Sequence, residues 1–388
     1  MKEAVNYFKE RFGSAPEHVA VAPGRLEFIG NHTDYNGGPV MGLAVDCVMG
    51  IALTRTEGDE AELVSQGRDD RVVVPLTDLK PVEGTDGWVN YPMGVFHVLR
   101  KHGYKMPGGF RMAVASTLPS GAGMSSSAAF ELSAAYAFSS AYGFKADRKQ
   151  MARYGREAEN NFVGMPCGIL DQGVSAFGEE NHIVKIDCKT ETFERVPMPA
   201  GVHFWVFNTQ KKHALLDSLY ATRHKECLEA FDILKVKYPE LECLADANLA
   251  QLESVSGQLS ESLLARARHV ITESMRVREM ASALTDGDLK RMGGLLLASH
   301  ESSRHDFENS CDELDFLVDE LRQVEGVYGC RLTGGGFGGA VMVVTDGTFS
   351  EASAKDACTR YQERFGHMPT VFHTRSGAGA HVVESVEA

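Results

Sequence analysis

A glycine- and serine-rich loop joins a strand candidate to a long alanine-rich helix candidate in this 388-residue chain. The strand candidate covers residues 110–117 (FRMAVAST), the loop 118–129 (LPSGAGMSSSAA), and the helix candidate 127–143. Glycine allows unusual dihedral angles and close approach of the backbone. A helix N-terminus presents unpaired N–H groups and partial positive charge, which suit phosphate. This order of elements predicts a phosphate-binding loop within an α/β fold.

We assign that role to Gly121, Gly123, Ser125, Ser126 and Ser127, because serine hydroxyls can donate to phosphate or ligate magnesium through oxygen. The loop is not a Walker loop, since it lacks the GK[ST] ending, and it does not match G-x-G-x-x-G. The plain alternative is a flexible turn with one serine as helix N-cap. That alternative explains one serine well, but it explains three serines with two glycines poorly.

A second loop, TGGGFGG (333–339), places five glycines between two strand-like runs. A hairpin turn normally needs one or two glycines. Close approach of this backbone to another backbone or to a phosphate explains five glycines better. Taken alone, this loop is weaker evidence for phosphate binding than the first loop.

Composition narrows the class of protein. The chain is 43% hydrophobic, which predicts a soluble globular protein, and its net charge of -14 argues against a nucleic-acid partner. The longest apolar stretch (37–53) is interrupted by Asp46 and is too short to span a membrane. The eight cysteines form no CxxC pair, so we expect reduced thiols in a cytoplasmic protein. The oligomeric state is left open, a monomer included.

The rest of the chain predicts mixed strands and helices. Strand candidates cover 44–55, 70–76, 182–188, 203–209 and both flanks of the second glycine loop (329–345); helical spacing covers 88–103 and most of 213–325. We interpret 190–201 as a connection and place a domain boundary near it. The expected domains are 1–195, joined by the tail 370–388, and 196–369.

Three polar clusters could face a ligand. The first, PGRLEFIGNHTDYNGG (23–38), sets polar groups beside packed apolar ones, and a polyhydroxy ligand would supply them with partners. The second (156–178) contains Glu159 and Asp171; a helix N-cap is the alternative for Asp171. The third (299–315) is as consistent with a solvated helix face as with a functional role.

Together these segments resemble the GHMP small-molecule kinases, and among them the galactokinases. The family's first motif, roughly GRxNLIGEHxDYxxG, is similar to residues 24–38, and its phosphate loop is similar to 118–129. CGILDQ (167–172) and LTGGGFGG (332–339) match two further motifs, and WVNYPMGV (88–95) and residues 208–227 also have counterparts in the same order. The resemblance covers nearly the whole chain. It implies a two-domain α/β fold with ATP and a sugar meeting in the cleft between domains.

The resemblance also implies a role for each matching residue. Asp171 would lie beside the sugar's anomeric hydroxyl as base or orienting group, and Arg25 would neutralise charge near it. Arginine against Asp171 would favour the carboxylate form, so we expect Asp171 to orient the hydroxyl and attract its proton late. Ser127 and Glu159 would help to hold Mg²⁺. The other matches divide between the phosphates of ATP (Gly121, Gly123, Ser125 and Ser126) and the sugar (Asn31, His32, Asp34, Gly168 and Tyr220).

Two positions depart from the first motif, because Glu27 stands where the family has Asn and Asn31 where it has Glu. The family glutamate is expected to accept a hydrogen bond from the sugar's 6-hydroxyl. Asn31 could hold that hydroxyl more weakly, tolerate a 6-carboxylate or suit a sugar without C6. Alternatively, Glu27 reaches the same space and compensates for the exchange. Outside this motif, Lys212 replaces a frequent Arg and Asn160 a frequent His.

The leading hypothesis is therefore an ATP-dependent sugar 1-kinase with galactose as the first substrate to test. A second hypothesis keeps the chemistry but changes the sugar to galacturonate or L-arabinose. The third is a sensor that binds sugar and ATP without turnover, against which the intact SSSAA loop, Glu159 and Asp171 argue.

Overall fold

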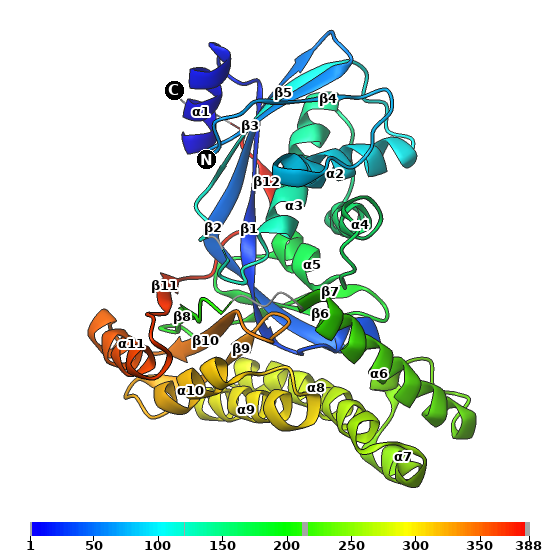
Figure 1. Ribbon diagram of the computed structural model, residues 1–388, viewed down its shortest axis with the longest axis vertical. Helices are drawn as coiled ribbons and strands as arrows, with labels where there is room; N and C mark the ends of the chain where they lie inside the picture. Colours follow the sequence, from blue (N-terminus) through cyan, green and yellow to red (C-terminus); the bar gives the residue numbers. More distant parts are fainter. Residues whose placement is uncertain (1, 120, 212–215, 385–388) are drawn as a thin grey trace.

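The computed structural model describes residues 2–119, 121–211 and 216–384, so Lys212 lies outside it. The larger of its two sheets runs in the order β12-β1-β2-β5-β3-β4, with β6 beside β2 and β7 beside β6 (Figure 1). Only the β3–β5 pair is parallel among the described strands. The strand bounds are β1 (His18–Ile29), β2 (Pro39–Thr56), β3 (Glu60–Ser65), β4 (Val72–Pro75), β5 (Gly109–Ser116), β6 (His182–Asp187), β7 (Thr192–Pro197) and β12 (His381–Val382).

Alternation of side chains along β5 explains how helices cover both faces of this sheet. Ala113 and Ala115 pack with Phe8 of α1 (Lys2–Phe12) on one face. Phe110 and Met112 belong to the main core on the other face. There α3 (Ser126–Tyr142) and α5 (Leu170–Phe177) lie on the sheet, with α2 (Asn90–Lys101) and α4 (Arg148–Ala158) packed behind them.

The smaller sheet runs in the order β11-β8-β10-β9 and is antiparallel throughout. Its strands are β8 (His203–Asn208), β9 (Val327–Thr333), β10 (Ala340–Thr345) and β11 (Thr370–Thr374). On β10, Val341 and Val343 pack with α10 (Asp312–Leu321) and α11 (Glu351–Phe365), whereas Met342 and Val344 join the core of the larger sheet. One continuous apolar core therefore links the two sheets. The remaining helices are α6 (Leu216–Lys237), α7 (Leu249–Glu253), α8 (Glu261–Thr285) and α9 (Leu289–Ser302).

Every strand and helix candidate named above coincides with an observed element. The segment predicted to be a connection, however, contains a strand. Residues 190–201 contain β7, which pairs with β6 along its whole length. Most side chains of β7 remain exposed or half-buried, and it pairs with β6 alone among the described strands. Because an edge strand of this kind needs no alternating hydrophobic pattern, its sequence reads as a loop.

The tail divides between the two sheets. Residues 370–374 form β11 beside β8 in the smaller sheet, and only residues 381–382 pair with β1 in the larger one. The expected assignment of the whole tail to the first domain therefore does not describe β11. The domain boundaries near 195 and 369 stay a prediction.

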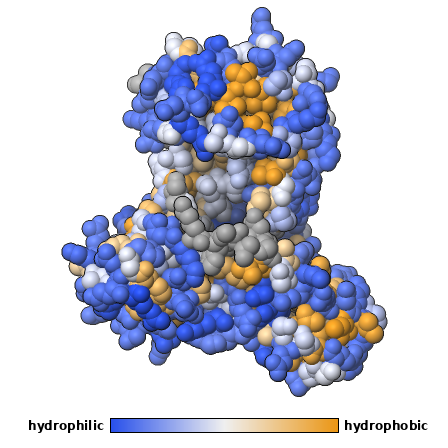
Figure 2. Space-filling view, in the orientation of Figure 1, coloured by the Kyte–Doolittle hydropathy of each residue, from blue (hydrophilic) through white to orange (hydrophobic). Residues whose placement is uncertain are grey.

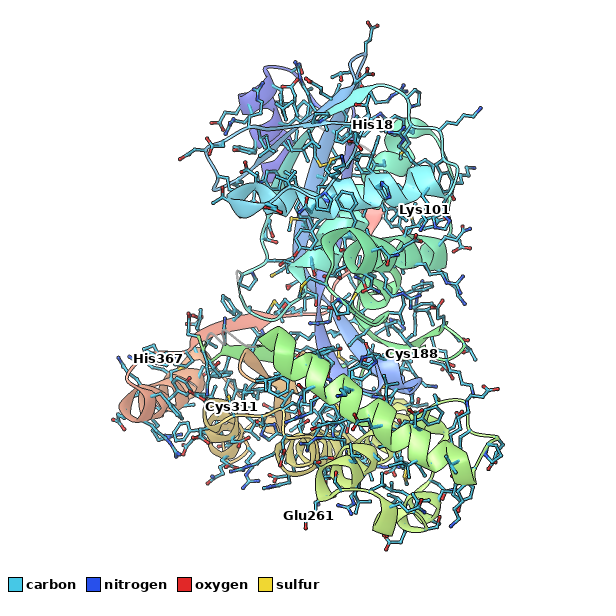
Figure 3. All side chains as sticks on the ribbon, turned by 45° about the vertical axis from the view of Figure 1, so that its right-hand side comes forward. His18, Lys101, Cys188, Glu261, Cys311 and His367 are labelled. Atoms are coloured by element: carbon cyan, nitrogen blue, oxygen red, sulfur yellow. The ribbon has the colours of Figure 1, made fainter. Side chains whose placement is uncertain are left out.

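All eight cysteines are free thiols, as expected. Cys188 and Cys311 lie in separate parts of the molecule (Figure 3). Within the described ranges, no helix combines the length and the apolar character needed to cross a bilayer.

Candidate functional site

Two adjacent cavities lie where β1, α5, α6 and the two glycine loops meet, and Arg25 lines both of them. The surface is hollowed between the upper and lower parts of the molecule (Figure 2). The first cavity, of about 480 Å³, has apolar and polar lining residues, which include Arg25, Glu27, Asn31, His32, Asp34, Glu159, Cys167, Gly168, Asp171 and Tyr220. The second, of about 710 Å³, is lined by both loops, including Gly121, Gly123, Ser125, Ser126, Ser127 and residues 333–336. Every predicted site residue therefore lines one cavity or the other.

Arg25 lies on β1 next to an irregularity in its pairing with β2, and its side chain is buried. Its Nε donates to Oδ1 of Asp171 at 2.7 Å and its Nη2 to Oδ2 at 3.0 Å. Its Nη1 donates to the carbonyl of Gly123 at 2.6 Å. Arg25 thus connects the carboxylate of Asp171 to the first glycine loop. The carboxylate and the loop are the two groups expected on opposite sides of a transferred phosphoryl group.

The first glycine loop has the backbone that its composition predicts. Gly121 and Gly123 have φ of 70° and 68°, and Ser125 is also left-handed, with φ of 48°. Ser125 precedes α3, but its hydroxyl makes no capping bond and instead donates to Asp171. Ser125 therefore stands at the N-cap position without acting as a side-chain cap. The α3 N-terminus opens toward the second cavity with its first N–H groups uncapped by Ser125.

Glu159 begins a short π-helix after α4 and belongs to a chain of buried polar groups. Nε2 of Gln172 donates to Oε2 of Glu159 at 2.6 Å and to Oε2 of Glu131 at 2.9 Å. Burial, followed by the charge of Asp171, raises the pKa of Glu159, while hydrogen bonds including one from Ser127 lower it. A cation beside Ser127 and Glu159 would relieve this accumulation of negative charge.

The turn after β1 is held in place by Glu273 of α8. Its Oε1 accepts the backbone N–H groups of Gly30 at 2.9 Å and Asn31 at 3.3 Å. Burial alone would raise the pKa of Glu273, but Arg276, with other positive groups, lowers it to about 2. The charged carboxylate therefore fixes a turn that contains two left-handed residues, Gly30 and His32.

His32 uses both ring nitrogens within the protein. Nε2 lies 2.9 Å from the carbonyl of Gly335 and Nδ1 lies 2.8 Å from the hydroxyl of Tyr35. Burial lowers the pKa of His32 to about 3, so the ring is neutral, Nε2 donates and Nδ1 accepts. Tyr220 of α6 packs against the ring with centroids 5.0 Å apart. These rings form an apolar wall of the first cavity.

Asp34 is the acidic group most affected by its surroundings in this cavity. Burial, with the nearby charges of Glu27 and Asp171, raises its pKa to about 7. A β-carbon on Gly168 would lie 1.8 Å from Oδ2 of Asp34, so the Cys167–Gly168 backbone can pass Asp34 only as glycine. Asp171 itself is the second residue of α5, whose N-cap is Ile169, so the N-cap alternative for Asp171 is wrong.

Several residues of the site were not anticipated. Trp88, Tyr91 and Arg68 line a third cavity of about 630 Å³ that shares Ser126 and Ser127 with the second. The segment WVNYPMGV carried that signal, because its two aromatic residues stand at the start of a helix, Trp88 before α2 and Tyr91 in its first turn. Ser303 and Asn309 of the third polar cluster are buried against Asn31, so neither a solvated face nor a separate site describes them.

Comparison with known proteins agrees with this geometry. Residues 6–55 match the galactokinase galactose-binding signature, 90–179 the N-terminal domain of GHMP kinases, and 280–366 their C-terminal domain. A galactokinase of Roseiflexus sp. (strain RS-1) is 36% identical over 376 residues, covering 96% of this chain and 94% of the relative.

Among solved structures, Lactococcus lactis galactokinase complexed with galactose superposes with a TM-score of 0.90 at 30% identity, covering 97% of this chain and 98% of that chain. Methanococcus jannaschii mevalonate kinase shares the fold, with a TM-score of 0.65 at 18% identity and coverage of 92% and 98%.

Proposed function

The chain belongs to the galactokinases of the GHMP kinase family, and on that basis we propose that it transfers the γ-phosphoryl group of ATP to the anomeric hydroxyl of galactose. The observation that carries the proposal is the position of Arg25, which borders both cavities while it holds Asp171. A sugar in the first cavity and phosphates in the second would meet at this pair.

Arg25 and Asp171 act by positioning and charge. Phosphoryl transfer passes through a loose transition state, in which alignment and neutralisation matter more than early proton removal. Both oxygens of Asp171 are already engaged by Arg25, and Oδ2 also by Ser125. Asp171 therefore orients the anomeric hydroxyl and receives its proton late, while Arg25 offsets charge on the transferred group.

The phosphates of ATP lie, in this proposal, at the N-terminus of α3. Gly121 and Gly123 supply backbone that carries no side chain toward the second cavity, and Ser125 and Ser126 add hydroxyl groups. The adenine base enters the third cavity, where the indole of Trp88 offers an aromatic surface. The shared lining of these cavities makes a continuous path for one nucleotide.

Ser127 and Glu159 are the residues that would hold Mg²⁺. Both offer hard oxygen ligands, which magnesium prefers, and the described residues form no larger group of acidic, histidine or cysteine side chains able to cage a metal alone. The remaining ligands would then be water and phosphate oxygens. When bound, the ion neutralises phosphate charge. Eight free thiols support a cytoplasmic location for the enzyme.

The sugar contacts follow from the groups that face the first cavity. Asp34 accepts sugar hydroxyls, Tyr220 and His32 present an apolar wall, and Gly168 leaves the space that Asp34 and the sugar share. Galacturonate would bring a further carboxylate against Asp34 and Asp171, which favours galactose over galacturonate.

The test is ATP turnover with magnesium across galactose, galacturonate, L-arabinose, N-acetylgalactosamine and glucose. The proposal expects the highest kcat/KM with galactose. A faster rate with another sugar would change the substrate and leave the phosphate chemistry standing. Binding of galactose and ATP without turnover would instead identify a sensor.

A further inference from the structure

The exchange of acid and amide between positions 27 and 31 places a carboxylate, Glu27, on the lining of the sugar cavity, and one of its oxygens receives no hydrogen bond from the described residues. We propose that Glu27, rather than Asn31, accepts a hydrogen bond from a sugar hydroxyl distant from the reacting one. Through that bond it selects neutral sugars over uronates. This inference rests on the proposed function, because it identifies a specificity residue of the same cavity.

Asn31 has no hydrogen-bonding capacity left for a sugar. Its Nδ2 donates to Oε1 of Glu27 at 2.8 Å and to the carbonyl of Gly334 at 2.9 Å. Its Oδ1 accepts from Nδ2 of Asn309 at 2.6 Å and from the hydroxyl of Ser303 at 3.4 Å. A primary amide has two N–H donors and two acceptor positions, so all four are engaged inside the protein.

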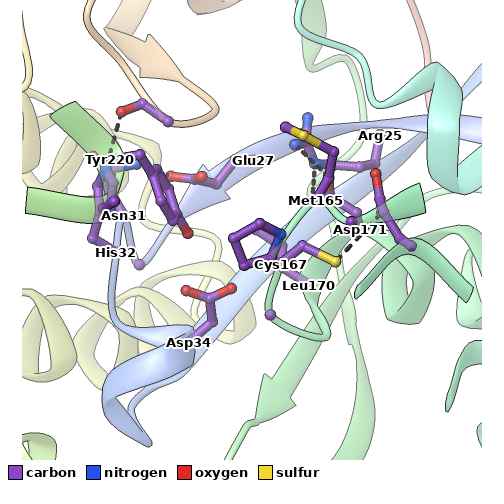
Figure 4. A pocket seen from close by; sticks show the side chains of 17 residues that line it. Arg25, Glu27, Asn31, His32, Asp34, Met165, Cys167, Leu170, Asp171 and Tyr220 are labelled. Atoms are coloured by element: carbon purple, nitrogen blue, oxygen red, sulfur yellow. Dashed lines mark hydrogen bonds and ion pairs between the residues drawn. The ribbon is translucent and has the colours of Figure 1, made fainter. Parts of the chain in front are cut away.

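Glu27, by contrast, can still accept a hydrogen bond from a sugar. Its Oε1 accepts from Asn31 and, at 3.1 Å, from Nη2 of Arg331, whereas no described residue donates to Oε2. The residue is only 5% exposed, yet it lines the first cavity. Figure 4 shows its carboxylate between the Arg25–Asp171 pair and the group formed by Asn31 and His32. A carboxylate oxygen that faces a cavity is stabilised by a donor, and a sugar hydroxyl in this cavity would supply one.

The surroundings of Glu27 hold it in one place. Its backbone N–H donates to Oγ1 of Thr333 at 3.0 Å, which ties β1 to β9 across the two sheets. Arg331 is fully buried and also donates to the carbonyl of Phe28 at 3.2 Å. Burial raises the pKa of Glu27, and Arg331 and Arg25 oppose that rise. A fixed acceptor of this kind selects by geometry as well as by charge.

The charge of the cavity explains the exclusion of uronates. Glu27, Asp34 and Asp171 all line it, and Arg25 is the only permanently charged cation among its described lining residues. Arg25 is already paired with Asp171. Arg331 lies beside Glu27 but is likewise already paired, with Oε1 of Glu27. A sugar carboxylate near Glu27 would therefore meet like charge without a free counter-ion.

The experiment compares wild-type enzyme with Glu27→Gln on galactose, its 2-, 3-, 4- and 6-deoxy analogues and galacturonate, measured as kcat/KM at saturating ATP. The substitution should lower kcat/KM for galactose by about 10- to 100-fold, the range for a lost hydrogen bond to a charged group, chiefly through KM. For the one deoxy analogue that lacks the bonded hydroxyl, it should change kcat/KM little. The ratio of galacturonate to galactose activity should rise.

Glu273→Gln is the matched control, because Glu273 is also a buried carboxylate bound to the 30–31 turn but does not line the cavity. It should lower kcat/KM for all these sugars by a common factor. If Glu27→Gln fails to fold, Glu27→Gln/Arg331→Gln removes both charges of the buried pair and carries the same test.

A uniform loss in Glu27→Gln across all analogues, or an unchanged rate with galactose, would overturn the inference while leaving the galactokinase activity of the wild-type enzyme intact. A wild-type enzyme that phosphorylates none of these sugars would overturn the proposed function, and the inference with it.

Discussion

Arg25 holds Asp171 through two parallel hydrogen bonds, with Nε 2.7 Å from Oδ1 and Nη2 3.0 Å from Oδ2. This bidentate geometry fixes the plane of the carboxylate as well as its position. The residues lie on β1 and α5, so the alignment of the proposed reactive group depends on the packing of that helix against that strand.

Replacing Asp171 with Asn keeps the shape of the side chain but removes its charge. We expect Asp171→Asn to lower kcat by about 10²- to 10⁴-fold, the range for a positioned acid–base group, with little change in ATP binding. Steady-state kinetics and direct titration with ATP separate the two effects. An equal loss of turnover and ATP affinity would assign Asp171 a structural role.

The pKa of about 7 at Asp34 predicts a pH-dependent affinity for the sugar. Because the carboxylate form accepts hydroxyls, kcat/KM for galactose should fall as pH drops below about 7. The stability effect has the opposite sign: the raised pKa contributes stability at low pH that is lost as pH rises through about 7. In Asp34→Asn the kinetic inflection should disappear. An inflection that persists in this variant would assign it to another group.

Gly168→Ala should damage the sugar site selectively. The added carbon would lie 1.8 Å from Oδ2 of Asp34, so either the loop or the carboxylate must shift. Since a shift of about 1 Å at a site can cost about 10²-fold in rate, we expect a large rise in KM for galactose and little change in KM for ATP. Gly294→Ala, where a β-carbon meets open space on α9, is the control and should have no effect. Unchanged galactose kinetics in Gly168→Ala would contradict the proposed fit.

Ser127→Ala should weaken the response to magnesium. The loss of one oxygen ligand is expected to raise the magnesium concentration for half-maximal rate by about 10-fold, with rate partly restored at high magnesium. Ser126→Ala should instead raise KM for ATP. The measurement is initial rate against magnesium at fixed ATP. An identical magnesium dependence in wild type and Ser127→Ala would remove Ser127 from the metal site.

Glu131 offers a test of the buried polar chain behind Glu159. Its side chain is completely buried, and burial followed by the charge of Glu159 raises its pKa. The raised pKa means that wild-type stability declines as pH rises toward it. Glu131→Gln should therefore stay within about 1 kcal/mol of wild type near pH 7 and lose less stability at higher pH, whereas Glu131→Ala should destabilise by about 2 kcal/mol or more. Urea unfolding at two pH values tests this, and equal destabilisation by Gln and Ala would contradict it.

The sequence predicts the elements of this fold better than it predicts their contacts. The glycine loop and α3 follow from local composition, because turn residues and helix formers act over short distances. β7 was missed because an exposed edge strand has no strong hydrophobic pattern. The pairing of Arg25 with Asp171 could be anticipated only through family resemblance, since no local signal relates two residues so far apart in the chain.

The sequence could not predict that the side-chain amide of Asn31 forms all its hydrogen bonds within the protein, because its partners are mostly distant in the chain. Its partners come from β1, the second glycine loop and the segment after α9, which only tertiary packing brings together. Comparison with the family motif placed Asn31 at the sugar and left Glu27 as the alternative. The structure distinguishes the two residues, because the amide of Asn31 has its hydrogen bonds within the protein, whereas Oε2 of Glu27 accepts none from the described residues.

The pairing of β12 with β1 constrains the order in which the larger sheet can form while the chain is being synthesised. Ala20 pairs with Val382, so the strand that carries Arg25 and Glu27 lacks its outer neighbour until nearly all the described chain has emerged. During synthesis β1 therefore exposes unpaired backbone groups at the sheet edge, where another nascent chain could add a strand. Within the described chain, this part of the β1 edge is covered only after β12 has been synthesised.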